Sequence, residues 1–252
     1  MAIWNDPQPG VGIGAAQRVN PGFAGQGAVD AGQRSFMLRI YNYMASGVLL
    51  SGLVAIVFAQ WLMSDQAHVQ AVFGSPLRWV IALAPLGFVM AMSFGLNRMQ
   101  TSTVQILFWV FCVAMGLSLS SIFLVYTGPS IAATFFASAA AFAGLSLVGY
   151  TTKRNLSAMG TFMAMGVWGL IAAMLLNTFW FHSGPMGLLI SLIGVVIFAG
   201  LTAWDTQRLK AMYWQVGGGA YAEKAAIMGA MTLYLDFINM FMFLLRFMGD
   251  RR

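Results

Sequence analysis

Charged side chains are scarce in this sequence. Only 8% of its 252 residues are Asp, Glu, Lys or Arg, whereas 60% are hydrophobic and the mean hydropathy is +0.77. A soluble domain carries about 25% charged residues. The shortage excludes a soluble Rossmann or barrel enzyme and a disordered chain, and it indicates that most of the surface faces lipid.

Cysteine and histidine are nearly lacking as well. The single cysteine, Cys112, has no partner for an intramolecular disulfide, which excludes a secreted disulfide scaffold. The histidines, His68 and His182, are isolated on predicted outer loops without a suitably spaced metal-binding partner. The sequence also has no HExxH motif, nucleophile elbow or Walker sequence. We therefore expect no covalent catalysis and no cofactor, so the protein is predicted not to be an enzyme.

The net charge of +6 does not form a pattern typical of nucleic-acid binding. The 13 Lys and Arg residues are spread between apolar stretches, and no basic face interleaved with aromatic residues is present. The expected partner is a lipid bilayer, with no nucleic acid.

Residues 1–34 differ in composition from the rest of the chain. Glycine and proline occupy ten of these positions, and no apolar run is long enough to pack. We expect a disordered amino-terminal tail over residues 1–34, followed by a membrane domain over residues 35–252.

Seven apolar stretches follow the tail, each of roughly 19 to 28 residues, and about 20 residues of helix cross the hydrocarbon once. None shows the alternating polarity of a strand in a membrane barrel. The sequence therefore predicts an all-α integral membrane protein built as a seven-transmembrane-helix bundle. The stretches lie near residues 36–63, 77–96, 104–126, 131–150, 158–180, 187–207 and 225–248.

Turn residues and basic residues predict the orientation. Gly74-Ser75-Pro76, Gly128-Pro129 and Gly184-Pro185 precede the second, fourth and sixth stretches, where a proline in the first helical turn loses no hydrogen bond. With the amino terminus inside, nine Lys and Arg residues fall on inner segments and four on outer ones, which favours a cytoplasmic amino terminus. Three of the outer charges lie at or after the carboxyl end of the last helix, so six crossings with a re-entrant final segment are the alternative.

Asp236 is the sharpest candidate for function, because charged groups inside membrane spans are rare and costly. It lies near the middle of the seventh stretch, and Thr232 and Asn239 share its helical face at i−4 and i+3. One interpretation is a titrating group on an ion or proton path. The alternative is a protonated or arginine-paired residue that only fixes helix register.

Asp205, near the inner end of the sixth stretch, is the second candidate, with Thr202 three residues before it and Arg208 three residues after it. A plain interfacial ion pair with Arg208 is the competing interpretation. If both helices were straight, Asp205 would lie roughly 10 Å nearer the inner surface than Asp236, so contact requires tilt, a kink or a water cavity. Two carboxyl groups that meet would titrate together as a proton sensor, and when ionised they offer hard oxygen ligands to a calcium ion. Arg98, at the inner end of the second stretch, is the predicted competing counter-charge.

Several segments together resemble the Bax inhibitor family, also called the transmembrane Bax inhibitor motif family, and in particular its bacterial members. The resemblance extends over about residues 36–249. The segments that carry it are Arg39–Met44, Gly116–Ser121, Gly149–Arg154, Gly200–Lys210 and Ala230–Phe241.

The resemblance implies a seven-helix bundle with its last helix at the centre, in a bacterial inner membrane. It also implies a pH-sensitive calcium leak, in which Asp205 and Asp236 form the carboxylate pair and Arg98 is the latch. Bacterial members are linked to an AAA-type membrane protease, so such a protease is an expected partner.

The leading hypothesis is thus a passive cation leak that carries calcium or other cations. The runner-up is a non-transporting membrane interaction protein, a regulator or subunit of a larger membrane complex, in which Asp236 only locks helix packing. An intramembrane enzyme ranks last, since the two carboxylates would be its only catalytic groups.

Overall fold

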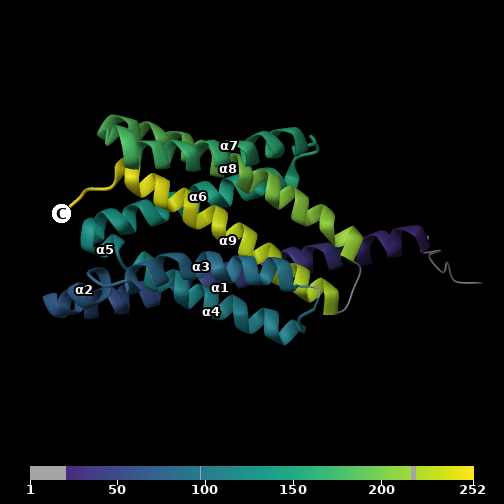
Figure 1. Cartoon of the computed structure of the whole chain (residues 1–252). Helices are drawn as coiled ribbons and strands as arrows, with labels where there is room; N and C mark the ends of the chain where they lie inside the picture. The colour runs from purple at the N-terminus through teal and green to yellow at the C-terminus, as the bar shows by residue number, and fades with distance from the viewer. Residues whose placement is uncertain (1–20, 97, 217–219) are drawn as a thin grey trace, which may run out of the picture.

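The computed structural model describes residues 21–96, 98–216 and 220–252, and these residues form a bundle of long helices (Figure 1). Inside lipid the backbone must satisfy its own hydrogen bonds, so apolar runs of this length become helices. In chain order the elements are α1 (Pro21–Ser64), α2 (Gln66–Phe73), α3 (Leu77–Gly95), α4 (Thr101–Leu119), α5 (Ile122–Val125), α6 (Gly128–Thr151), α7 (Ser157–Leu176), the π-helical turn η1 (Asn177–Phe181), α8 (Gly184–Val216) and α9 (Ala220–Met248).

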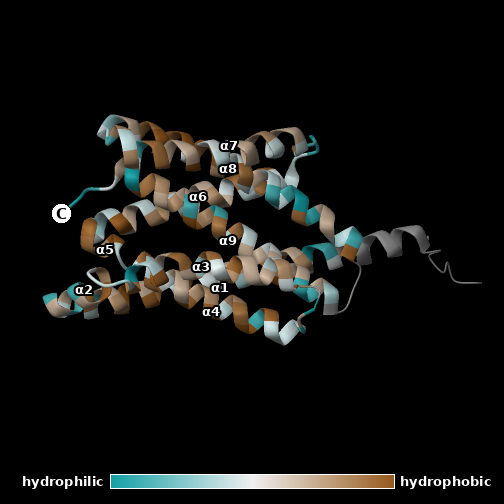
Figure 2. Cartoon of the chain, viewed as in Figure 1, coloured by the Kyte–Doolittle hydropathy of each residue, from teal (hydrophilic) through white to brown (hydrophobic). Residues whose placement is uncertain are grey.

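Seven helical segments in the described residues are long and apolar enough to cross a membrane, which confirms the predicted fold class. They correspond to the seven apolar stretches one by one, and hydrophilic residues gather toward the helix ends (Figure 2). The spans are Ala31–Ser64, Leu77–Gly95, Thr101–Val125, Gly128–Thr151, Ser157–Phe181, Gly184–Val216 and Tyr221–Met248.

The predicted turn residues lie where helices begin. Pro76 directly precedes α3, Pro129 lies in the first turn of α6, and Gly184 opens α8. The short helix α2 was not predicted. It begins after Asp65, whose carboxylate accepts a hydrogen bond from the Ala67 N–H at 2.8 Å.

Helix α9 is the central helix of the bundle. It runs between a group containing α1, α3 and α4 and a group containing α6, α7 and α8 (Figure 1), and it packs on α1, α4, α6 and α8. In its most apolar window 67% of the residues are buried, against 11% in α3 and in α7. Its side chains therefore face protein, and polar groups on it are shielded from lipid.

The amino-terminal segment differs from the expected tail of residues 1–34. Residues 1–20 lie outside the described residues, whereas helix α1 begins at Pro21. Residues 32 and 33 of this helix contact the carboxyl-terminal part of α8, where Gln33 Nε2 donates a hydrogen bond to the Lys210 carbonyl at 3.0 Å. Gly32 lies so close to Tyr213 that a Cβ there would be 2.1 Å from the Tyr213 hydroxyl oxygen. Composition alone revealed neither contact.

Candidate functional site

Asp205 of α8 and Asp236 of α9 meet in the interior of the bundle. Each residue is 5% exposed, and the two carboxyl groups lie close enough to interact. Two ionised carboxylates that close in a buried site repel each other, so a proton shared between them stabilises the pair. Both helices are inclined relative to α1 and α3 (Figure 1), and such a tilt removes the axial offset expected for straight helices.

Asp205 Oδ1 and Asp236 Oδ2 are buried and have no hydrogen-bond partner among the described residues. A buried acceptor without a partner costs about 1 to 3 kcal/mol. The pair therefore retains free lone pairs of the hard type that a proton or a calcium ion binds.

Arg208 is the cation beside this pair. Its Nε lies 3.6 Å from Asp205 Oδ1, the only ion pair among residues 21–96, 98–216 and 220–252, and its charge acts on both carboxyl groups. The Arg208 side chain is 47% exposed, and its guanidinium lies 5.0 Å from the centre of the Trp204 ring. An arginine so placed can stabilise one negative charge on the pair while its outer part remains accessible.

A cavity of about 440 Å³ leads from the end of the bundle where α8 ends and α9 begins to Arg208. Thr232 of α9 and Leu96, just after α3, also line it, so three membrane segments meet around the arginine. Neither aspartate lines this cavity, and Arg208 is the residue that both borders it and pairs with Asp205. On the sequence prediction of orientation, this end is the cytoplasmic one.

The other polar residues predicted on the two helices do not hydrogen-bond to the carboxyl groups in the described residues. The buried hydroxyl of Thr202 donates to the Phe198 carbonyl at 2.8 Å, and that of Thr232 donates to the Met228 carbonyl at 3.1 Å. Asn239 is half-buried on α9. Both threonines thus satisfy their hydrogen bonds within their own helices.

Arg98, the predicted latch, lies elsewhere. It is exposed in the turn between α3 and α4, where its N–H donates to the Gly95 carbonyl at 2.9 Å. No ion pair joins it to either aspartate among the described residues. The arginine next to the pair is Arg208, which the sequence presented only as a partner of Asp205 on the same helix.

Two polar contacts near the pair escaped sequence reasoning. The Ser146 hydroxyl of α6 lies 3.3 Å from that of Thr206, the residue after Asp205. The Ser51 hydroxyl of α1 lies 2.7 Å from that of Tyr234, two residues before Asp236. Serines occur throughout these spans, and the partners are far apart in sequence, so no local pattern indicated either contact.

A comparison with known families identifies the family of the chain. The family model described as "Inhibitor of apoptosis-promoting Bax1" matches residues 33–252, which include almost all of the seven spans. The chain belongs to the Bax inhibitor family. The expected resemblance is therefore confirmed.

Bacterial relatives of this Bax inhibitor family protein match along most of their length. An uncharacterized protein of Rickettsia prowazekii is 47% identical over 223 residues, which cover 88% of this chain and 92% of the relative. The inner membrane protein YbhL of Escherichia coli is 40% identical over 226 residues, 88% of this chain and 94% of YbhL. The uncharacterized protein YrjE of Lactococcus lactis is 42% identical over 218 residues, 86% of this chain and 92% of YrjE.

Proposed function

We propose that this Bax inhibitor family protein is a pH-sensitive passive calcium leak of the bacterial inner membrane, controlled by Asp205 and Asp236. The observation that carries the proposal is the proximity of two buried carboxyl groups beside one arginine that borders a cavity. The inner membrane assignment rests on the likeness to YbhL.

The chemistry of the pair favours competition among three kinds of positive charge. A shared proton and the Arg208 guanidinium stabilise the pair at rest. A calcium ion binds carboxylate oxygens and brings two positive charges, so it would replace both. Calcium is here the transported ion, and acid competes with it by protonating its ligands.

The opposite side of the pair is closed by aromatic side chains. Phe237, next to Asp236 on α9, packs edge to face against Phe135 and Phe142 of α6, with ring centres 5.6 and 5.7 Å apart. Phe241 packs on Phe135 in the same way at 6.1 Å. Ions do not pass a dry aromatic contact, so the leak requires α6 and α9 to separate here.

Calcium flux into liposomes that contain the purified protein tests the proposal. We expect Asp236→Asn to lower the flux severalfold at neutral pH and to flatten its pH dependence, because the variant lacks an ionisable group. Asp250→Asn is the matched control, since Asp250 is exposed at the other end of α9. A melting temperature near that of the wild type would show that the variant is folded. Unchanged flux and an unchanged pH profile in folded Asp236→Asn would refute the proposal.

A non-transporting role in a larger membrane complex is the second candidate. The positions of Gly144 in α6 and Gly169 in α7 favour it, because no atom of the protein lies within 4 Å of a Cβ placed at either one. Small residues on open faces let a partner helix approach closely. Copurification with a stoichiometric partner, such as an AAA-type membrane protease, together with no flux from the isolated protein, would favour this role.

In a calcium leak, the two aspartates bind protons and cations and carry out no covalent chemistry. An intramembrane aspartyl protease would use such a pair to activate water. Cleavage of a transmembrane peptide by the wild type, but not by Asp236→Asn, would contradict a purely non-enzymatic role.

A further inference from the structure

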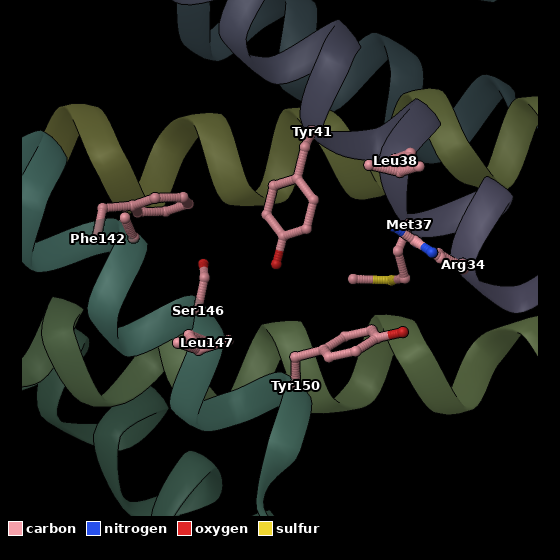
Figure 3. Close-up of a pocket in the computed structure, with 9 residues that line it drawn as sticks. Arg34, Met37, Leu38, Tyr41, Phe142, Ser146, Leu147 and Tyr150 are labelled. Atoms are coloured by element: carbon pink, nitrogen blue, oxygen red, sulfur yellow. The ribbon is translucent and has the colours of Figure 1, made fainter.

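A groove of about 410 Å³ opens between α1 and α6, apart from the cavity at Arg208 (Figure 3). Its walls are almost entirely apolar, with Met37 and Phe142 buried on its floor and Leu38 and Leu147 exposed along its rim. The rim residues are 52% and 63% exposed, and both belong to membrane-spanning segments. The groove therefore opens toward the hydrocarbon.

One end of this groove carries a positive charge. Figure 3 shows the Arg34 side chain at that end and the Tyr150 hydroxyl directed toward it, while the hydroxyls of Tyr41 and Ser146 turn into the space between the helices. The groove lining contains no aspartate or glutamate. Lys210 adds a second positive charge behind Tyr150, because its Nζ donates to the Tyr150 carbonyl at 2.9 Å and lies 4.5 Å from the ring centre.

The Arg34 end of the groove is held in place by packing. The neighbouring Gln33 is buried and hydrogen-bonded to the Lys210 carbonyl, and Gly32 packs against Tyr213. Residues 32 and 33 of α1 are thus held against α8, and Arg34 lies next to them beside an apolar slot. A site fixed in this way does not lose binding free energy to ordering the segment that carries it.

We propose that this groove binds one anionic phospholipid of the leaflet on the predicted cytoplasmic side. One acyl chain lies between α1 and α6 along Leu38 and Leu147, and the phosphate lies at Arg34 with the Tyr150 hydroxyl as a second donor. The combination of an apolar slot, a cationic end and no carboxylate in the lining matches a molecule with a hydrocarbon chain and a negative head. Basic pockets between transmembrane helices on this side of a membrane bind anionic head groups in the same manner.

Native mass spectrometry of the full chain in detergent tests the proposal. The protein is titrated with phosphatidylglycerol and with phosphatidylcholine that carries the same acyl chains. We expect the wild type to retain one phosphatidylglycerol in preference to phosphatidylcholine, and Arg34→Gln to reduce this preference about fivefold. Arg39→Gln is the matched control, because Arg39 is exposed on the same helix and does not line the groove.

A second variant tests the part of the groove that holds the acyl chain, independently of the part that holds the head group. Ala143 lines the groove and is exposed, so Ala143→Phe fills the slot without disturbing the core. We expect this variant to lose tight retention of both lipids at an unchanged melting temperature. Equal retention of the two lipids by the wild type, or wild-type retention by Ala143→Phe, would overturn the proposal. Displacement of the lipid by inorganic phosphate would overturn it too, since the site would then bind a free anion.

Discussion

At the scale of single residues, the arrangement of charge around Asp205 and Asp236 governs what the protein can bind. The pair is buried, and Arg208 is partly exposed. A buried charge is costly unless a compensating charge accompanies it. Arg208 is the only described residue that forms an ion pair with either aspartate.

Replacing Arg208 tests which arginine competes with the transported ion. We expect Arg208→Gln to raise calcium flux into liposomes about two- to fivefold at neutral pH, because a partly exposed ion pair contributes up to about 1 kcal/mol. Arg98→Gln is the matched control and should leave the flux unchanged, since Arg98 lies in an exposed turn away from any ion pair in the described residues. A higher flux in Arg98→Gln together with an unchanged flux in Arg208→Gln would show instead that Arg98 competes with the transported ion.

The buried hydroxyl contact between Ser51 and Tyr234 links α1 to the central helix. Ser51 also donates to the Cys112 carbonyl at 2.7 Å, so three helices meet at one hydroxyl. We expect Tyr234→Phe to reduce the stability of the protein by about 1 kcal/mol, the typical contribution of one buried hydrogen bond. Thermal unfolding in detergent measures this change, and Tyr221→Phe at an exposed site should leave the melting temperature unaltered.

At the scale of the elements, the close approach of α6 and α8 positions Asp205. A Cβ on Gly149 of α6 would lie 2.2 Å from the carbonyl oxygen of Ala203 on α8, so only glycine fits there. This contact brings α6 beside the segment that carries Asp205 and Thr206. It also explains how Ser146, one turn earlier on α6, reaches Thr206.

Adding one methyl group at Gly149 should separate the two helices. We expect Gly149→Ala to destabilise the protein by about 1 to 3 kcal/mol, because overpacking forces the backbone to shift. Gly144→Ala in the same helix provides the control, since no atom lies within 4 Å of its added Cβ and alanine favours helix. A melting temperature that falls equally in both variants would indicate that the α6–α8 contact is not tight.

At the scale of the whole molecule, seven crossings predict that the start of α1 and the end of α9 lie on opposite sides of the membrane. Residues 250–252 are tied to the α5–α6 connection, where the Thr127 N–H donates to the Asp250 carbonyl at 3.0 Å and the Arg252 N–H to the Val125 carbonyl at 2.9 Å. The carboxyl end therefore lies at the same end of the bundle as the start of α6. The orientation of this end relative to the cell stays a prediction from the distribution of basic residues.

Cysteine labelling in intact cells checks the orientation. Cys112 is fully buried and is the only cysteine of the sequence, so a membrane-impermeant maleimide should not modify the wild type. We expect His182→Cys and Arg252→Cys to react from outside and Ser157→Cys to react only after the cells are opened, because these residues lie at opposite ends of the spans. Protection of Arg252→Cys in intact cells would favour six crossings.

Much of the fold could be predicted from the sequence, because a chain that crosses lipid must satisfy its backbone hydrogen bonds internally, as a helix does. The apolar stretches have the length that one helical crossing requires, Pro76 directly precedes α3, and Pro129 lies in the first turn of α6. The start of α1 at Pro21 did not follow from composition. The π-helical turn at Asn177–Phe181 and the short helix α2 were not predicted either.

The sequence by itself determined that this is a membrane protein of seven helices with two acidic residues in the last two spans, because hydropathy and the cost of charge in lipid depend on composition and position along the chain. Only the tertiary structure decided that the two carboxyl groups lie together and that Arg208, not Arg98, accompanies them. Helix tilt and the close contact at Gly149 depend on how remote segments pack, and no local pattern encodes those distances.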